Sequence, residues 1–327
     1  MNILKPPRLK KSDLIGVVAP AYPFPNESDK DYYFEYLRGK KELELMGFNV
    51  VEGKNIHKKE WWRAGTPKER AEDINDMYKN SDVKAVIAHD GANDSISILE
   101  YLDFDLIKNN PKPFIGFSNI TNIHSAIFAK TGMVGFHMGL LTYELGKYWQ
   151  ESDSGKKKIA KDYFYRALTS DEPLGEINNI SDWECWRDGE ADGRLFGGNL
   201  SMIDSLIGTP YFPTTNDLDG AVFFWEIDDS ATFRIERILT HMKYAGILNV
   251  ISGMVIGKLV DIRPTTTEFK EPPLREMIMS ILNDFHFPVL ANVDFGHKIA
   301  QIPMPIGIRV SVDATNVKLN FLESAVL

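Results

Sequence analysis

Short apolar runs alternate with amphipathic segments through the first 145 residues. The run LIGVVA at 14–19 ends at Pro20, and the run VKAVIA at 83–88 ends in the polar turn HDGAND. Before the second run lie two segments with helical spacing, at 32–48 and 67–80. Because strands that alternate with helices form parallel sheets covered on both faces, this pattern predicts an α/β domain with a doubly wound parallel sheet of the flavodoxin or glutaminase type.

The pattern changes after residue 145. A charged stretch poor in β-branched residues predicts a helical linker between domains at 146–178. The remaining residues, 179–327, contain short apolar runs separated by turns and one amphipathic segment, FRIERILTHMKYAG. We therefore expect an N-terminal domain at 1–145 and a smaller C-terminal mixed β/α domain after the linker. Gly197 and Gly198 are expected in turns of this second domain.

Composition limits the classes of partner. The chain of 327 residues carries a formal net charge of -9, which argues against binding to nucleic acid polymers through phosphate neutralisation. Its single cysteine, Cys185, excludes an internal disulfide and suits a reducing compartment. The basic N-terminus lacks an apolar signal core, and no stretch approaches the ~20 apolar residues that span a bilayer. We therefore expect a cytoplasmic protein without a membrane partner.

The segment FIGFSNIT at 114–121 places a serine at a corner of the chain. An apolar run ends at Ile115 and the residues from Asn119 onward have helical spacing, so Ser118 lies where a strand gives way to a helix. By local pattern alone, such a serine is more often a helix N-cap than a nucleophile. The catalytic alternative requires a histidine to take the hydroxyl proton and a carboxylate to orient that histidine.

Candidates for both partners occur in the C-terminal half. Of seven histidines, His297 stands out because it lies in a loop that leaves an apolar strand, where a side chain can point into a cleft between domains. Glu226 ends the apolar run AVFFWE, where a glutamate can be partly buried and can orient a histidine. Asp228 and Asp229 are rival carboxylates. Taken singly, these residues also fit a hydrogen-bonded loop histidine and a solvated strand end.

Backbone donors could stabilise negative charge beside the serine. The N–H of Asn119 begins the helix after Ser118, and Gly91 lies in another turn at a strand end, so the two amides could form an oxyanion hole. His89 and Asp90 resemble a metal pair but have no third ligand at a recognisable spacing. The sequence also contains no P-loop and no G-x-G-x-x-G motif. We therefore expect neither a zinc enzyme nor a dinucleotide-binding domain.

Five blocks in a fixed order carry a resemblance: IGVVAPAYP, LEYLDFDLIKNNPKPFIGFSNITNIHSAIFAKTG, GRLFGGNLSMIDSLIGTPYFP, FWEIDDSATFRIERILTHMKYAGIL and GHKIAQIPMPIG. Through them the chain resembles the serine LD-carboxypeptidase family, in particular its branch of microcin C immunity peptidases. The resemblance implies that Ser118 is the nucleophile, His297 the general base and Glu226 the orienting acid. It also implies that the amides of Gly91 and Asn119 form the oxyanion hole, that no metal or organic cofactor takes part, and that the protein is a homodimer.

The chain departs from the family pattern at two places. The residue after the nucleophile is usually aspartate and is Asn119 here, which keeps the backbone amide but removes a charge. The turn that is usually rich in glycine is HDGAND here, with His89 and Asp90 before Gly91. Substrate preference could differ from that of the family accordingly.

Two tryptophans in the segment SDWECWRDGEADG suggest a substrate contact. In the immunity-like branch an aromatic loop in this region contacts the nucleotide part of the substrate, so the resemblance implies this role for Trp183 and Trp186. Stacking of indole rings on a base gives a physical reason. By residue type alone, an anchor of a surface loop or a dimer contact is the more common role.

These inferences predict a serine carboxypeptidase or amidase that cleaves a C-terminal amide bond of a small peptide-like substrate through an acyl-enzyme. A murein LD-tetrapeptide and a microcin C-like aminoacyl nucleotide both fit. Two alternatives stay open. One is an esterase of the α/β-hydrolase type, although Ile120 stands where the G-x-S-x-G elbow requires its last glycine. The other is a catalytically silent ligand-binding protein of peptidase descent.

Overall fold

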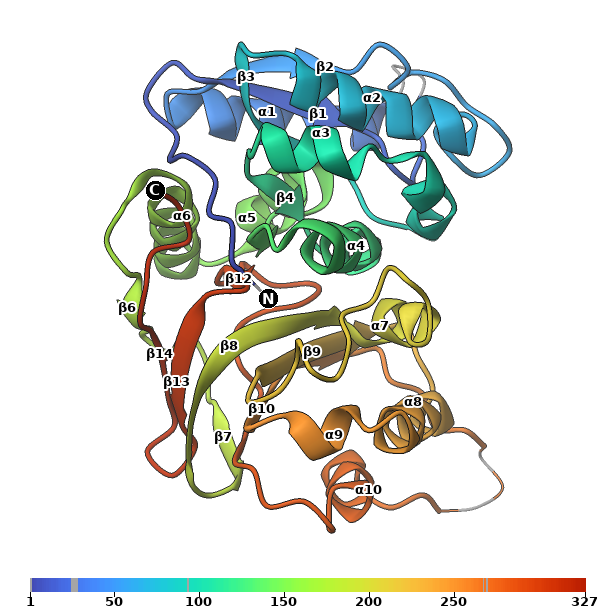
Figure 1. The fold of residues 1–327 in the computed structure, drawn as a ribbon, viewed down its shortest axis with the longest axis vertical. Helices are drawn as coiled ribbons and strands as arrows, with labels where there is room; N and C mark the ends of the chain where they lie inside the picture. The colour runs from blue at the N-terminus through green and yellow to red at the C-terminus, as the bar shows by residue number, and fades with distance from the viewer. Residues whose placement is uncertain (1, 25–28, 93, 267, 269) are drawn as a thin grey trace.

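The computed structural model contains two β-sheets, one built mainly from each half of the chain (Figure 1). It describes residues 2–24, 29–92, 94–266, 268 and 270–327. In Figure 1 the N-terminal half, in blue and green, lies above the C-terminal half, in yellow to red. The predicted α/β fold class, a doubly wound parallel sheet followed by a mixed β/α part, is confirmed.

The first sheet has six strands in the order β12-β5-β4-β3-β1-β2. Strands β1 to β5 are parallel and follow the flavodoxin order 2-1-3-4-5, whereas β12 comes from the C-terminal half and pairs antiparallel with β5. The central strands are almost fully buried, because helices cover both faces of the sheet. The strands are β1 (Leu14–Val18), β2 (Asn49–Glu52), β3 (Val83–Ala88), β4 (Phe114–Gly116), β5 (Gly135–His137) and β12 (Met304–Ile306).

Helices connect the parallel strands of this sheet. Helix α2 begins with a capping box, in which Thr66 Oγ1 accepts the Glu69 N–H and Glu69 accepts the Thr66 N–H. Helices α2, α3 and α4 pack in sequence along one face, in front of the sheet in Figure 1. The helices are α1 (Lys30–Leu45), α2 (Pro67–Lys79), α3 (Phe104–Asn109) and α4 (Thr121–Thr131), with a 3₁₀ helix η1 (Ser95–Tyr101).

The region of the predicted linker is helical. A π-helix, η3 (Leu141–Tyr148), continues into α5 (Trp149–Glu151), and α6 (Ser154–Thr169) follows. The π-helix packs against α1 of the N-terminal half. The domain boundaries at 145 and 178 stay predictions. Strand β12 shows that the first sheet takes one strand from beyond them.

The second sheet has eight strands in the order β6-β14-β13-β8-β9-β10-β11-β7. Its centre, from β8 to β11, is parallel, and the outer strands pair antiparallel. Parallel pairing places the carboxyl ends of β8 and β9 side by side, with Asn199 opposite Glu226. The strands are β6 (Gly175–Glu176), β7 (Glu184–Arg187), β8 (Glu190–Asn199), β9 (Val222–Asp228), β10 (Gly253–Val260), β11 (Val289–Ala291), β13 (Arg309–Asp313) and β14 (Lys318–Phe321).

Four helices accompany the second sheet in the described residues, not the single one predicted. The predicted helix is α8 (Thr232–Tyr244), and the others are α7 (Leu200–Leu206), α9 (Ile247–Val250) and α10 (Leu274–Ile281). The prediction is wrong because the three additional helices have only seven, four and eight residues, too few for an apolar repeat to stand out. No helix in the described ranges is long and apolar enough to cross a membrane.

Gly197 and Gly198 lie in the central strand β8, so their predicted placement in turns is wrong. A Cβ atom on Gly197 would lie 1.7 Å from the carbonyl oxygen of Phe224 on β9. A Cβ atom on Gly198 would lie 2.5 Å from Thr121 Cγ2 at the start of α4. Glycine is therefore needed here for close packing of a strand against its neighbours, a role that a single sequence does not distinguish from a turn.

Gly197→Ala should destabilise the fold strongly. The added methyl group would collide with backbone, and φ is +156°, so we expect the free energy of unfolding to fall by at least about 3 kcal/mol. Gly208→Ala is a matched control, because Gly208 also has a positive φ, +86°, but its Cβ position has no atom within 4 Å. That variant should lose only about 1 kcal/mol. Urea unfolding of both variants checks this, and equal losses would contradict it.

Candidate active site

Ser118 occupies a sharp corner between β4 and α4. Strand β4 ends at Gly116, and a short 3₁₀ helix, η2 (Ser118–Ile120), leads into α4. Ser118 has φ +60°, a left-handed conformation that is uncommon for a residue with a side chain. A strained strand-to-helix turn of this kind presents a hydroxyl above the end of a sheet, as in nucleophile elbows.

The structure brings Ser118, His297 and Glu226 together in one chain of hydrogen bonds. Nε2 of His297 lies 3.0 Å from Ser118 Oγ, and Nδ1 lies 2.7 Å from Glu226 Oε2. Because a carboxylate can only accept, Nδ1 carries the proton and Nε2 faces the serine hydroxyl with its lone pair. This is the arrangement that lets an imidazole take a proton from serine.

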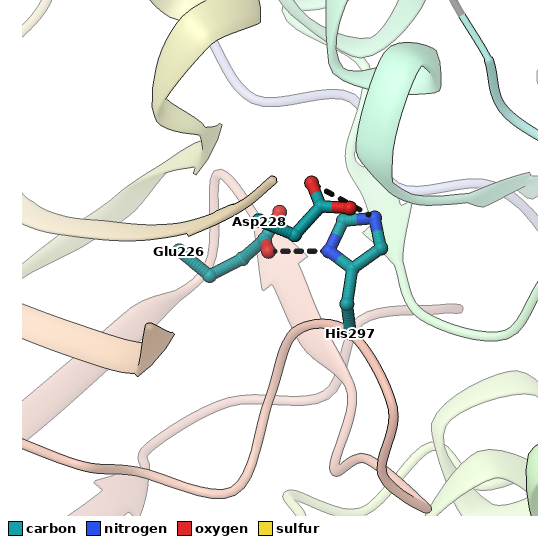
Figure 2. A group of neighbouring side chains, drawn as sticks. All are labelled: Glu226, Asp228 and His297. Atoms are coloured by element: carbon teal, nitrogen blue, oxygen red, sulfur yellow. Dashed lines mark hydrogen bonds and ion pairs between the residues drawn. The ribbon is translucent and has the colours of Figure 1, made fainter. Parts of the chain in front are cut away.

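The two carboxylates that compete for the imidazole lie at different nitrogens (Figure 2). Glu226 is fully buried at the end of β9, and Asn199 donates to its second oxygen, Oε1, at 3.0 Å. Asp228 is 34% exposed and lies on the other side, with Oδ1 3.4 Å from Nε2 of His297. Asp229 lies farther out and pairs with Arg263 at 3.0 Å. Glu226 therefore has the position that orients the ring, and Asp228 lies beside the reacting nitrogen.

Charges around the imidazole favour its protonated form. Burial alone lowers the pKa of His297, but the charge and hydrogen bond of Glu226, with the charges of Asp228 and Asp90, outweigh that effect. The net pKa of His297 is raised above its ordinary value of 6.5. Burial also raises the pKa of Asp228. The pocket is thus suited to stabilise an imidazolium formed during a reaction.

The two predicted backbone donors lie beside the serine. A Cβ atom on Gly91 would lie 3.2 Å from Ser118 Cβ and 3.6 Å from the Asn119 nitrogen, so all three residues border one small space. The Gly91 N–H donates to Asp90 Oδ1 at 2.7 Å, and the other oxygen of Asp90 accepts from Tyr32 at 2.6 Å. A substrate oxygen would have to replace the Asp90 carboxylate at this amide. The oxyanion-hole assignment stays a prediction.

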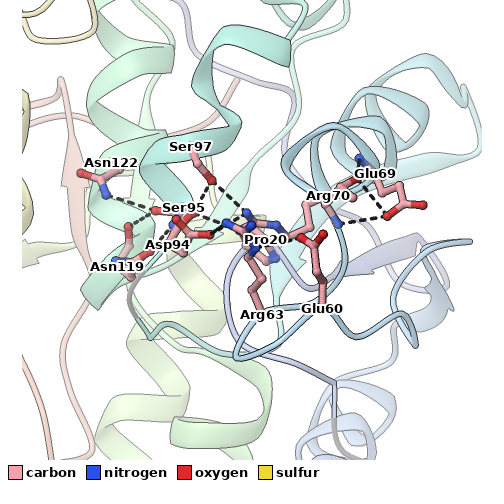
Figure 3. Close-up of polar contacts among 11 residues, drawn as sticks. Pro20, Glu60, Arg63, Glu69, Arg70, Asp94, Ser95, Ser97, Asn119 and Asn122 are labelled. Carbon is pink, nitrogen blue, oxygen red and sulfur yellow. Dashed lines mark hydrogen bonds and ion pairs between the residues drawn. The ribbon is translucent and has the colours of Figure 1, made fainter.

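The side chain of Asn119 is buried and uses both ends of its amide, and Figure 3 shows its contact with Ser95. Its Oδ1 accepts the Ser95 N–H at 2.7 Å, and its Nδ2 donates to Met202 Sδ at 2.9 Å. The Ser95 hydroxyl in turn donates to the Asn119 carbonyl at 2.6 Å. An aspartate would offer no donor to the sulfur, so asparagine fits this environment. The departure from the family pattern therefore has a local structural reason.

A buried carboxylate fixes the loop that carries His297. Gln301 accepts the N–H of Gly296 at 3.3 Å, and Glu144 of the π-helix accepts both the backbone N–H of Gln301, at 3.2 Å, and its side-chain amide. Trp149 donates to the same carboxylate at 3.0 Å. Burial raises the pKa of Glu144 to about 7. The N-terminal half thus holds the histidine loop through contacts that sequence reasoning missed.

The two predicted substrate-binding tryptophans lie away from Ser118. Trp183 is buried, and its Nε1 donates to Asp294 Oδ2 at 2.6 Å, at the start of the His297 loop. Trp186 lies on the edge strand β7, where its Nε1 donates to Glu184 at 2.8 Å. Neither lines the cavity at Ser118. Their role in binding substrate stays a prediction, and Trp183 has a structural contact that its sequence context did not reveal.

A cavity of about 360 Å³ opens above the serine and the histidine. Asp90, Asp228 and Asp229 give its wall negative charge, while Arg234 on α8 is the only arginine or lysine among the described residues that line it. The lining residues are Asp90, Ala92, Ser118, Leu140, Tyr143, Asn199, Ser201, Met202, Asp228, Asp229, Arg234 and His297. Sequence reasoning did not select Arg234, because nothing in the amphipathic pattern of α8 distinguishes it from other exposed cations.

Glu226, Asp228 and His297 also form a group whose ligand atoms lie within 4.8 Å of one another, close enough to hold a metal ion. Both ring nitrogens of His297 already have protein partners, Glu226 at one and Ser118 at the other. The donor set therefore fits a proton relay better than a cation site. His89, which resembles half of a metal pair in the sequence, is buried and lies 2.9 Å from the Tyr22 carbonyl oxygen. The expectation of a metal-free site stays a prediction.

Comparisons with known proteins agree on one family. The chain matches the LD-carboxypeptidase N-terminal domain over residues 15–138 and the LD-carboxypeptidase C-terminal domain over 192–312. It is 31% identical over 311 residues to a probable murein peptide carboxypeptidase of Bacillus subtilis, covering 94% of this chain and 91% of the relative. It is 28% identical over 314 residues to the microcin C7 self-immunity protein MccF of Escherichia coli, covering 88% of each.

Solved structures show the same fold. The crystal structure of an MccF-like protein from Bacillus anthracis superposes with a TM-score of 0.83 at 27% identity, covering 98% of this chain and 99% of that one. MccF in complex with aspartyl sulfamoyl adenosine superposes with a TM-score of 0.85 at 23% identity, covering 99% of this chain and 100% of that one. The second likeness concerns the fold alone.

Proposed function

Since the chain belongs to the LD-carboxypeptidase family, we propose that it is a serine carboxypeptidase that cleaves the C-terminal amide bond of a small peptide-like substrate. Membership of the family supports a peptidase. The single observation that supports the serine mechanism is the pair of contacts at His297, 3.0 Å to Ser118 and 2.7 Å to Glu226, beside a cavity. The proposed roles are those of nucleophile for Ser118, general base for His297 and orienting acid for Glu226.

The reaction proceeds in two halves. Ser118 Oγ attacks the carbonyl carbon while its proton passes to Nε2 of His297, and the carbonyl oxygen becomes an oxyanion that the amides of Asn119 and Gly91 stabilise. The C–N bond then breaks as His297 returns the proton to the leaving amine, which leaves an acyl ester on Ser118. A water molecule, deprotonated by the same imidazole, then attacks the ester carbonyl. The C–O bond to Ser118 breaks as His297 returns that proton to Ser118 Oγ, which releases the acid and restores the free hydroxyl.

The charges of the cavity suggest how the substrate is oriented. A carboxypeptidase needs a cation for the free carboxylate of the leaving residue, and Arg234 is the arginine that the cavity offers beside its three aspartates. The family relative named for murein peptides favours a murein LD-tetrapeptide as substrate. A microcin C-like aminoacyl nucleotide is the second substrate class, in keeping with the MccF relative.

Turnover and active-site labelling test this proposal together. We expect the purified protein to release the terminal D-residue from an LD-tetrapeptide and a fluorophosphonate to label Ser118, because the neighbouring imidazole activates its hydroxyl. Peptide mass mapping locates the label. The proposal would be contradicted if neither substrate class is turned over above the uncatalysed rate and Ser118 stays unlabelled.

Arg234→Met should raise KM for a substrate with a free C-terminal carboxylate. Loss of a charged hydrogen bond at this position is expected to raise KM by about 10- to 100-fold. A substrate whose terminus is a carboxamide should be unaffected by the variant, because it offers no charge to the arginine. Arg237→Met on the same helix is the control, since Arg237 is exposed and pairs with Asp204 at 3.8 Å. An unchanged KM in Arg234→Met would contradict this role.

The pH profile of kcat/KM should show an acid limb above pH 6.5, the ordinary pKa of histidine. Burial lowers the pKa of His297, but the surrounding carboxylates outweigh burial, so the ring gains its proton at a higher pH than usual. Activity is lost as the pH falls through this pKa, because only the neutral ring accepts a proton. Asp228→Asn removes one of these charges and should move the limb to lower pH. A limb that stays in place would contradict this account of the pKa.

A further inference from the structure

Two tryptophans are exposed at the tip of a tight turn outside the catalytic cavity. Glu60 and Arg63 exchange backbone hydrogen bonds of 2.8 and 3.0 Å, so Trp61 and Trp62 are the two residues of the turn between them. The tryptophans are 69% and 62% exposed, and their ring centroids lie 5.6 Å apart. A contiguous exposed patch of large aromatic side chains marks an interaction site more often than a single one does.

The backbone of this turn is strained at Trp61. Its φ is +55°, a value that two-residue turns usually assign to glycine or asparagine. A bulky aromatic side chain at positive φ is a conformational outlier, and such outliers cluster at active sites and ligand-binding positions. The strain therefore points to a role for the exposed indole.

A network of ion pairs connects this turn to the nucleophile corner (Figure 3). The guanidinium of Arg63 lies 5.1 and 5.7 Å from the centroids of the two indoles, and it pairs with Asp94 at 2.8 Å. Asp94 also pairs with the buried Arg70 at 2.9 Å. Ser95, the next residue, contacts Asn119 beside the serine. The aromatic pair is thus held in a fixed position relative to the catalytic cavity.

A second cavity of about 200 Å³ lies against the pair. Tyr32 lines this cavity and donates its hydroxyl to Asp90 at 2.6 Å, and Asp90 lines the catalytic cavity. The two cavities therefore adjoin at this contact. Arg234, proposed above to hold the leaving residue, belongs to the C-terminal half. The acyl part of a substrate can therefore extend in the other direction, along the N-terminal half toward the second cavity. The second cavity is lined by Tyr22, Pro23, Phe24, Asp29, Tyr32, Lys59, Trp61 and Trp62.

We propose that Trp61 and Trp62 bind a sugar ring attached to the acyl side of the substrate. Arg63 lies over both indoles, and their large exposed fractions leave aromatic surface on which the C–H face of a pyranose can stack. Asp29 and Lys59 in the same cavity can hydrogen-bond its hydroxyl and acetamido groups. This inference rests on the proposed function, because a murein peptide is attached to an amino sugar.

Kinetics with two substrates test the subsite. We expect Trp62→Ala to raise KM for an N-acetylmuramoyl tetrapeptide by about tenfold or more, with unchanged kcat and with unchanged KM for the free tetrapeptide. Tyr244→Ala, which removes another exposed aromatic side chain, should change neither. Equal effects on the two substrates, no effect on the muramoyl peptide, or a loss confined to an aminoacyl sulfamoyl nucleoside would overturn the proposal.

Binding without turnover separates this inference from the proposed function. In the Ser118→Ala background, calorimetry should show that Trp61→Asn weakens binding of the muramoyl tetrapeptide by about tenfold or more. Because asparagine tolerates positive φ, the same change should leave the urea unfolding midpoint unchanged or raise it. Failure of the parent to turn over any peptide would count against the proposed function alone. Unaltered binding by Trp61→Asn would overturn the sugar subsite.

Discussion

Ser118→Ala should lower kcat for an LD-tetrapeptide by about 10⁴- to 10⁶-fold, because the variant cannot form the acyl ester. KM should change little, since the hydroxyl mainly serves the bond-forming step. The free energy of unfolding should stay within about 1 kcal/mol of the parent, because alanine fills the same corner without a new contact. Release of the terminal residue, followed by mass spectrometry, measures the effect on rate, and urea unfolding measures the effect on stability.

Ser125→Ala is the matched control for this variant. Ser125 lies in α4, close to the corner in sequence, and is buried, with no hydrogen-bond partner at its hydroxyl among the described residues. Its removal should leave kcat within about twofold of the parent. Activity retained by Ser118→Ala, or an equal loss in both variants, would show that the hydroxyl of Ser118 does not act as nucleophile.

Glu226→Gln should lower kcat by about 10³- to 10⁴-fold, although the substitution changes one atom of the side chain. A glutamine amide can donate to Nδ1 of His297, which would place the ring proton on Nε2 and remove the acceptor that Ser118 needs. The carboxylate is also fully buried, so its charge contributes strongly to stabilising the imidazolium. Rate measurement at a pH above the acid limb of the parent isolates this effect from simple protonation of the ring.

Asp228→Asn provides the comparison that decides between the two carboxylates. Asp228 undergoes the same chemical change, but it is partly exposed and lies 3.4 Å from the other ring nitrogen. Its loss should lower kcat by at most about tenfold, together with the change in the acid limb described above. If Asp228→Asn costs as much as Glu226→Gln, or if Glu226→Gln is nearly silent, the orienting role is assigned to the wrong residue.

The main strands of the fold were predictable because burial on both faces leaves a strong signal. Strands such as β1 and β3 are continuous apolar runs, and turns or helices with clear limits separate them. Strand β12 was not predictable, because its three residues, Met304–Ile306, gain their partner β5 only after the chain returns from the second sheet. The end of strand β8 was not predictable either, because its glycines are typical of a turn. They are needed for close packing against Phe224 and Thr121, which the sequence does not show.

The candidate site also combines residues that the sequence predicts with contacts that it does not predict. Ser118, Glu226 and His297 each stand at the end or corner of an apolar element, so their positions in the sequence indicate chemistry without any knowledge of the distances between them. The groups that hold them were not visible in the sequence. Asn199 and Glu226, which form a hydrogen bond, are 27 residues apart in the sequence, and Gln301 and Glu144 are 157 residues apart. No local sequence pattern encodes such contacts. The hydrogen bonds that position the candidate catalytic side chains therefore depend on packing between segments that are distant in the sequence.

A single-turnover reaction tests most directly whether a hydroxyl from the N-terminal half and an imidazole from the C-terminal half act together. Excess protein is mixed with an LD-tetrapeptide, quenched in acid and digested for mass spectrometry. The mechanism predicts that release of the terminal residue coincides with an acyl mass on the peptide that contains Ser118, and that Ser118→Ala and His297→Ala show neither. Release of the residue at the parent rate by either variant, or an acyl mass on another residue, would contradict it.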